Sequence, residues 1–253
     1  KKNINYFVII ILSFISSLYL FETFLHIRDS INLSNKEKIY QRETGLVYDK
    51  RSKFEISKDL KKEDKKIILS LSSWIKQFLD TEDILPLSGL SYSKSIHCNE
   101  NGYFSIYLSD RYGFNNPDED WDKNTVEHVV VGDSFVHGAC VNRPNDISSV
   151  LRTISNNGVI NLGISGNGPL SEYATLREYL PSNVKNIIWI YFEGFDLMDL
   201  MIEKKNPILI KYLKDLQFSQ SLIEKNYVKD GVVNKIIKKE FERISEKYDD
   251  DNN

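Results

Sequence analysis

The chain has 253 residues, which at roughly 100 to 200 residues per domain allows one domain with accessory segments or at most two domains. Apolar residues make up 41% and charged residues 27%, which excludes a chain that is disordered throughout. The formal net charge of −3 offers no broad basic surface, so we expect no nucleic-acid partner. Two cysteines and four dispersed histidines disfavour a metal site.

The N-terminal segment from Asn3 to Phe21 is a run of 19 uncharged residues that follows two lysines. A helix of this length approaches the roughly 30 Å thickness of a bilayer's hydrocarbon core. A cleaved signal peptide ends in small residues, whereas this run ends at Glu22 and Thr23. We therefore expect a single-pass anchor at residues 3–25, with the rest of the protein on the extracytoplasmic (periplasmic) side. The alternative is a buried core helix.

Residues 26–66 are polar and charge-rich, which predicts a spacer that leads into a helix. From Ile67 to Leu79 apolar residues recur at helical spacing. This pattern predicts an amphipathic helix that packs one face on a domain, with Trp74 in the core, and ends before Pro86.

The segment from Ser95 to Tyr107 alternates around Asn101-Gly102. This dipeptide accepts the positive φ values of a tight turn, so the segment predicts a β-hairpin. Residues 67–125 together then form an accessory region.

Three short apolar runs follow, and each ends at a glycine-containing turn: Val126–Val131, Val159–Leu162 and Asn186–Phe192. Helical patterns lie between them, at Ile147–Ser155 and Leu170–Leu180. This alternation is typical of a buried parallel sheet in an α/β domain, whose site lies at the carboxyl ends of the strands. We place this domain at residues 126–253, with a mostly helical part after Asp196.

Ser134 lies where the first of these strands turns into a helix. At a helix N-terminus, unpaired N–H groups and the positive end of the dipole stabilise an oxyanion. Ser134 is therefore a candidate nucleophile. The alternative is a serine that only caps its helix.

Three motifs in sequence carry a resemblance to a known family: Gly132-Asp133-Ser134, Asn161–Pro169 and Glu193–Asp196. In this order they resemble the SGNH/GDSL hydrolase superfamily over roughly residues 110–199. The segment Asp110–Asn116 also resembles the lead-in of membrane-anchored bacterial members. The resemblance implies a three-layer, flavodoxin-like parallel sheet. It also implies an esterase, lipase or carbohydrate acyl-esterase activity, or a role in the O-acetylation of exopolysaccharide.

The resemblance also assigns roles to residues. It makes Ser134 the nucleophile and, through its own N–H, an oxyanion donor. It makes Gly166 the second donor, with Gly163 as the fallback. The third motif normally supplies an asparagine donor where this chain has Phe195, and we consider Asn167 or a water as its substitute.

The general base is the largest departure, because no histidine follows His137 while the family's Asp-x-x-His lies near the end of the domain. Three explanations stay open. We favour a sequence that is cut short, with an incomplete sheet, because such sheets usually have about five strands and three are visible. Otherwise His137 serves as the base one turn beyond Ser134, or the protein is a pseudoenzyme that binds glycan without cleaving it.

Further candidates at the mouth of the site are Asp133, His137, Glu193 and Asp196. A carboxylate there could orient a base or bind sugar hydroxyls, and the alternative is a solvated or helix-capping role. His26, His97 and His128 have no chemical context, so we expect structural roles for them.

Cys98 and Cys140 are disulfide candidates, because the outer side of a membrane permits disulfides. Such a bridge requires the hairpin to lie near the first helix of the α/β domain.

We therefore expect a serine ester hydrolase or O-acyltransferase that acts on an acylated cell-envelope or exported carbohydrate and needs no cofactor. The alternative is an inactive SGNH-like protein that binds glycan or assists polysaccharide assembly.

Overall fold

The computed structural model describes residues 2–72 and 84–251, and the chain divides into two compact units. The first unit comprises Lys1–Lys50 with Asn101–Tyr103, and the second comprises Arg51–Glu100 with Phe104–Asn253. Each unit is described by itself below.

The first unit is dominated by one long helix, α1 (Lys2–Thr44). Its segment Ile9–Arg28 is long and apolar enough to cross a membrane, and none of that segment is buried. The alternative of a buried core helix is therefore wrong. The helix also continues beyond the expected anchor and takes up the first part of the expected spacer, residues 26–66.

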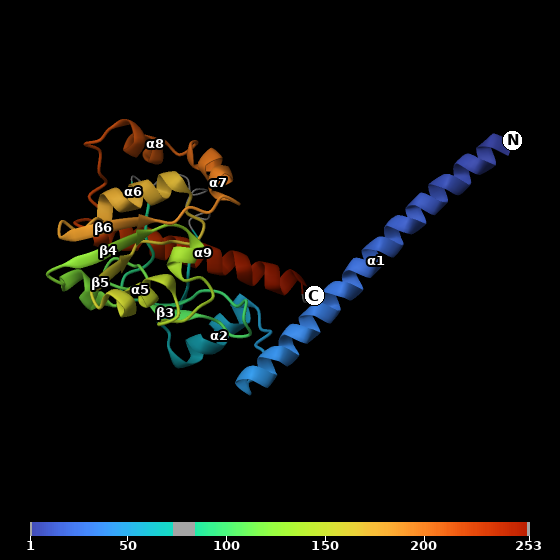
Figure 1. Ribbon diagram of the computed structural model, residues 1–253, viewed down its shortest axis with the longest axis horizontal. Helices are drawn as coiled ribbons and strands as arrows, with labels where there is room; N and C mark the ends of the chain where they lie inside the picture. The colour runs from blue at the N-terminus through green and yellow to red at the C-terminus, as the bar shows by residue number, and fades with distance from the viewer. Residues whose placement is uncertain (1, 73–83, 252–253) are drawn as a thin grey trace. The chain divides into compact units, whose positions relative to one another are not determined.

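The centre of the second unit is a three-stranded parallel sheet (Figure 1). Its strands are β4 (Val126–Val131), β5 (Gly158–Asn161) and β6 (Val184–Trp189). The order β5-β4-β6 places the first strand in the middle. The predicted parallel sheet is confirmed, and the chain is a mixed α/β protein.

Helices cover both faces of β4, which explains its unbroken run of valines. Val129 and Val131 pack with α6 (Pro169–Tyr179) in the main core. Val130 faces the other way and packs with Leu151 of α5 (Ile147–Ser155). Because both faces are buried at Val129–Val131, this half of the strand carries no polar residue.

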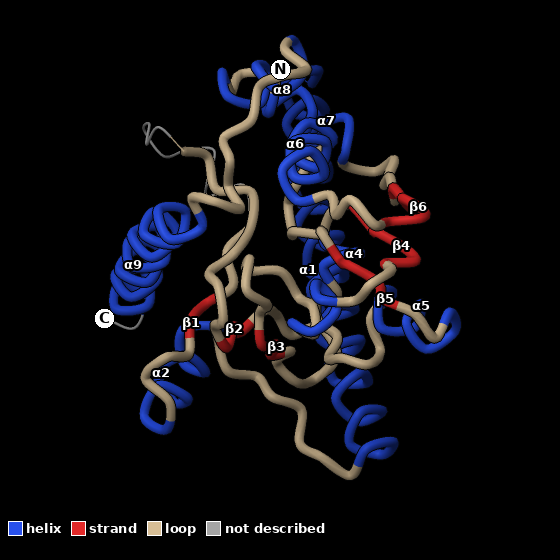
Figure 2. Tube along the Cα trace, turned by 90° about the vertical axis from the view of Figure 1, so that its left-hand side faces the viewer, coloured by secondary structure: helices blue, strands red, loops and turns tan. Residues whose placement is uncertain are grey.

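A smaller sheet contains β1 (Ile68–Leu69), β2 (Lys94–Ile96) and β3 (Ile106–Leu108). Strands β2 and β3 are antiparallel, so the predicted hairpin is confirmed, and Gly102 has the expected positive φ of 91°. Strand β1 runs parallel to β2 and contacts α2 (Lys53–Glu63) and α9 (Asn226–Asp251) (Figure 2).

The amphipathic helix predicted from Ile67 is wrong at its start. Ile68 and Leu69 form strand β1, paired with Ser95 and Ile96 of β2, so this segment is extended and not helical. The remainder of that prediction, including Trp74, lies in residues 73–83 and therefore outside the described residues. The helix in this region is α2, which begins with a capping box formed by Ser52 and Glu55.

Short helices complete the described part of the second unit. They are η1 (Asp118–Asp122), α4 (Ser134–His137), α7 (Asp196–Glu203) and α8 (Pro207–Lys214). The mostly helical part predicted after Asp196 is confirmed by α7, α8 and α9.

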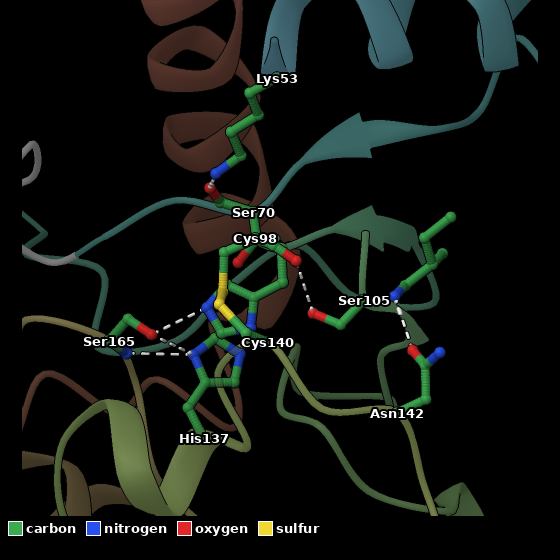
Figure 3. Close-up of a disulfide and its surroundings, with 10 residues drawn as sticks. Lys53, Ser70, Cys98, Ser105, His137, Cys140, Asn142 and Ser165 are labelled. Carbon is green, nitrogen blue, oxygen red and sulfur yellow. Dashed lines mark hydrogen bonds between the residues drawn. A yellow bond between two sulfur atoms is a disulfide. The ribbon is translucent and has the colours of Figure 1, made fainter. Parts of the chain in front are cut away.

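The structure joins Cys98 and Cys140 in a disulfide, with their Cα atoms 4.8 Å apart (Figure 3). Cys98 follows β2, and Cys140 follows α4. The bridge therefore connects the accessory hairpin to the α/β domain, as the sequence requires of such a pair.

Replacing both cysteines by serine should lower the stability of the second unit. The two residues are 42 apart in sequence, and a loop of this length gives about 4 kcal/mol of cross-link stabilisation in the chain-entropy description. We expect the urea midpoint, followed by circular dichroism of the detergent-solubilised chain, to fall. Unfolding the unmodified chain in dithiothreitol should give the same shift, and the reductant should leave the double variant unchanged. Equal midpoints for the two proteins would contradict the prediction.

Candidate active site

The first two sequence motifs are in direct contact at the carboxyl edge of the parallel sheet. The Ile164 N–H donates to the Gly132 carbonyl oxygen at 3.4 Å. A Cβ at Gly163 would lie 2.4 Å from the His137 nitrogen and 2.7 Å from the Val136 carbonyl carbon. Only glycine fits here, so the turn after β5 lies against the backbone of α4.

The third motif joins them through aromatic rings. Phe192 packs on Phe135, with ring centroids 5.2 Å apart, and on Phe195, with centroids 5.6 Å apart. Phe135 and Phe195 are both exposed. The residue after Ser134 and the third motif therefore form one apolar surface, which we call the phenylalanine ledge (Phe135, Phe192 and Phe195).

Ser134 is the first residue of α4 and is half-buried. The helix cap is not Ser134 but Asp133, whose side chain accepts a hydrogen bond from the Phe135 N–H at 3.0 Å. The structure thus gives the capping role to the neighbouring aspartate. The Ser134 side chain also forms a hydrogen bond with the Asp133 carboxylate, which partly offsets the effect of burial on the pKa of Asp133.

The two candidate oxyanion glycines lie in the segment between β5 and α6. The Gly163 N–H donates to Asn161 Oδ1 at 2.8 Å, so this amide is already used and the fallback donor is excluded. Gly166 has a φ of 77° and is half-buried in the turn before α6. Gly166 stays the candidate donor.

Asn167 has a side-chain N–H that can serve as the third oxyanion donor, whereas Phe195 has none. The Asn167 side chain is 2% exposed, and its Nδ2 has no hydrogen-bond partner among the described residues. An unpaired buried amide donor is costly, and a ligand oxygen would satisfy it. Phe195 is 59% exposed, precedes α7 as its cap residue, and makes no side-chain capping hydrogen bond.

Buried carboxylates gather beside these turns, and sequence reasoning found only two of them, Asp133 and Asp196. The additional members are Glu172, Asp199 and Glu203. Burial raises the pKa of each of these five groups, and the charge of Asp196 adds to the increase at Asp133, Glu172 and Asp199. Within the described residues, no set of three or more His, Cys, Asp or Glu side chains could hold a metal ion.

The partners of these carboxylates explain why sequence reasoning missed some of them. Glu203 accepts hydrogen bonds from the N–H groups of Gly168, Leu170 and Ser171, so it caps α6 from a distant helix. A hint was available, because Gly168 and Pro169 open that helix without a side chain that could cap it locally.

Asp196 accepts from the Phe192 N–H, while its Oδ1 has no hydrogen-bond partner among the described residues. Glu193, in contrast, is exposed.

His137 does not lie at the mouth of the site, and this prediction is wrong. Its side chain is buried, the Ser165 N–H donates to Nδ1 at 3.0 Å, and Nε2 lies 3.0 Å from the Tyr107 hydroxyl (Figure 3). Both ring nitrogens are used inside the core. The Ser165 contact directs the ring into the core beneath the hairpin, so His137 is not placed as the base for Ser134.

His97 stacks near His137, with ring centroids 4.2 Å apart, and its Nε2 lies 2.8 Å from Ser165 Oγ. Burial, together with the charge of Lys53, lowers the pKa of His97 to about 3. The ring therefore stays neutral at physiological pH, in line with the structural role expected for it.

No family model matches the chain, and no curated protein or solved structure matches it. The resemblance to SGNH/GDSL hydrolases therefore depends on the three motifs themselves. The fold places these motifs at neighbouring carboxyl ends of one parallel sheet.

The protonation of Glu172 gives a testable pH dependence. Burial raises the pKa of Glu172 to about 8, although the Trp189 Nε1–H donates to its carboxylate at 2.6 Å. Between pH 4.5 and 8 the folded state then binds a proton that the unfolded state releases, so the stability falls as the pH rises through this range. Glu172→Gln mimics the neutral acid and keeps an acceptor for Trp189.

We expect the unfolding free energy of Glu172→Gln to exceed that of the unmodified protein by a margin that grows with pH, at up to about 1.4 kcal/mol per unit. Urea titrations at a series of pH values measure it. The matched control is Glu193→Gln, at an exposed position, which should follow the unmodified protein. A margin that is constant with pH would contradict the prediction.

Proposed function

We propose that the protein performs ester chemistry with Ser134 as the nucleophile, within an SGNH-type, flavodoxin-like domain. The observation that carries the proposal is the position of Ser134 after the central strand, with the helix-capping role taken by Asp133. The contacts of the other two motifs with this turn support it. The substrate class is an acylated carbohydrate of the cell envelope or an exported polysaccharide.

In this mechanism the Ser134 hydroxyl attacks the acyl carbonyl carbon and gives up its proton, which the sugar oxygen takes up when the C–O bond to the sugar breaks after a tetrahedral intermediate. The N–H groups of Ser134 and Gly166 donate to the oxyanion. The Nδ2 of Asn167, which has no hydrogen-bond partner among the described residues, is the group available to replace the donor that Phe195 lacks. The acyl group then passes to water in hydrolysis or to a sugar hydroxyl in transfer. The phenylalanine ledge offers an apolar contact for the acyl chain.

The location proposed for this chemistry is the extracytoplasmic side of a membrane. The apolar part of α1 supports an anchor, and the two lysines before it favour a cytoplasmic N-terminus. A disulfide between Cys98 and Cys140 fits an oxidising compartment.

The direct test is activity on p-nitrophenyl acetate with imidazole added as an external base. Within the described residues no histidine is placed to deprotonate Ser134, and a small imidazole in solution can take that proton. We expect imidazole to raise the hydrolysis rate of the unmodified chain above that of Ser134→Ala at the same imidazole concentration. The Ser134→Ala variant corrects for hydrolysis by imidazole itself, and equal rates would contradict the role of Ser134.

A second prediction concerns the missing oxyanion donor. Phe195→Asn introduces an amide donor at the position where the family has asparagine, and such donors are worth about 10² to 10³ in rate. We expect Phe195→Asn to raise the Ser134-dependent rate by up to this factor. Asparagine is also a better helix cap than phenylalanine, so α7 should not be weakened.

The matched control is Phe195→Leu, which removes the ring without adding a donor and should not increase the rate. If Phe195→Asn and Phe195→Leu change the rate equally, the position does not supply an oxyanion donor, and Asn167 already fills that part of the site.

A glycan-binding protein without catalysis is the second candidate function. Two observations favour it: Phe195 cannot donate a hydrogen bond, and His137 is held in the core by Ser165 and Tyr107. This candidate is supported if the unmodified chain and Phe195→Asn both match Ser134→Ala in every ester assay while their circular dichroism is unchanged.

A further inference from the structure

A cavity of about 720 Å³ opens between β3, the loop that precedes η1, and α5. This volume is in the range of pockets that bind small ligands. None of the lining residues belongs to the three turns of the candidate active site. The cavity is therefore separate from the candidate active site.

The charged group that distinguishes the cavity is Arg143. Its Nη2 donates to the Leu108 carbonyl oxygen at 3.0 Å, and no described carboxylate lies within ion-pair distance of it. Arg152, on the same wall, is satisfied by Asp120, Asn116 and the Val159 carbonyl. Burial, with a further contribution from Arg152, lowers the pKa of Arg143, and the charges of Asp146, Glu119 and Asp110 only partly offset this effect.

The loop that carries Arg143 is held in place by two contacts just before this residue. Cys140 is joined to Cys98, and Asn142 Oδ1 accepts a hydrogen bond from the Ile106 N–H at 2.9 Å (Figure 3). The guanidinium group is thus fixed relative to β3 before any ligand arrives. A group that is positioned in advance loses less entropy on binding.

The remaining walls are suited to a ring with an apolar face. Tyr92 is 63% exposed, and Leu108 is exposed beside it. The negative charge of Asp118 is balanced by Arg111, whose Nη2 lies 2.9 Å from it. Glu119 is exposed at the rim, where solvent screens its charge and its oxygens can accept hydrogen bonds from hydroxyl groups.

We propose that this cavity binds an acidic sugar unit, a uronate, with its carboxylate on the Arg143 guanidinium and its C–H face on the Tyr92 ring. The requirement for an anion follows from Arg143. The sugar ring depends in addition on the proposed function, for which this cavity would hold a unit of the substrate chain away from the acyl group.

Binding of glucuronate, glucose and inorganic phosphate to the full chain in detergent tests this proposal. We expect saturable binding of glucuronate by calorimetry or ligand-observed NMR, at least about tenfold tighter than that of glucose. A hydrogen-bonded charged group is worth about 1.5–3 kcal/mol, so Arg143→Gln should weaken glucuronate binding by roughly 10- to 100-fold. Arg143→Lys keeps the charge but not the planar guanidinium group, so its affinity for glucuronate should lie between those of the unmodified chain and Arg143→Gln.

The controls separate the parts of the proposal. Arg243→Gln removes an exposed arginine of α9 outside the cavity and should leave glucuronate binding unchanged. Tyr92→Ala should weaken glucuronate binding and leave phosphate binding unchanged. Circular dichroism confirms that each variant is folded. If phosphate binds as tightly as glucuronate and Tyr92→Ala affects neither, the cavity is a simple anion site and the proposal is overturned. Absence of glucuronate binding to the unmodified chain also overturns it.

The proposal and the proposed function can fail separately. Ser134→Ala should bind glucuronate as the unmodified chain does, because Ser134 lies outside the cavity. Glucuronate binding without any Ser134-dependent ester hydrolysis would overturn the proposed function alone. Ester hydrolysis without glucuronate binding would overturn the acidic-sugar proposal alone.

Discussion

The close approach of Gly163 to α4 is the constraint on which the candidate site depends. A side chain at this position would collide with the backbone at Val136 and His137, so the turn after β5 reaches the turn after β4 only because residue 163 is glycine. That contact lets the Ile164 N–H bond to the Gly132 carbonyl oxygen. Ser134 and Gly166 then belong to adjoining loops. The central position of β4 also brings the third motif close, because the carboxyl end of β4 has a neighbouring strand on each side.

The electrostatics of this region follow from burial more than from ion pairing. Five carboxylates lie beside the turns, and burial is the largest cause of the raised pKa at each. Glu203 is stabilised by backbone N–H groups and Glu172 by the Trp189 ring N–H. Protonation of these carboxylates therefore reduces the cost of burying them, as an ion pair with a cation does at other buried carboxylates. The proposed nucleophile, Ser134, lies beside groups whose charge changes with pH.

Local signals in the sequence were sufficient for the parallel sheet and the hairpin. A few consecutive residues are enough in each case: the valines of β4 indicate a buried strand, and Asn101-Gly102 indicates a tight turn. The strand at Ile68–Leu69 was missed because Ile67, Ile68 and Leu71 fit a helical pattern, while Ile67, Leu69 and Leu71 fit an alternating one. Only pairing with β2, which lies far along the chain, decides between the two patterns.

The candidate site shows the same division between local and distant causes. Ser134 and Gly166 could be found from their motifs, and Asp133 could be placed beside them. Sequence spacing put His137 one turn from Ser134, yet its ring direction is set by Ser165 and Tyr107, which come from other parts of the chain. The role of Glu203 at the start of α6 likewise depends on tertiary packing.

The disulfide also orders events during synthesis of the chain. Cys98 emerges 42 residues ahead of Cys140, and β4 and α4 lie in the interval between them. The hairpin therefore has no covalent partner until the central strand and the Ser134 turn have followed it. By then packing of the hairpin against α4 can bring the two sulfur atoms together. The bridge can therefore form only after β4 and α4 have been synthesised, and an oxidant that acts earlier would find Cys98 without its native partner.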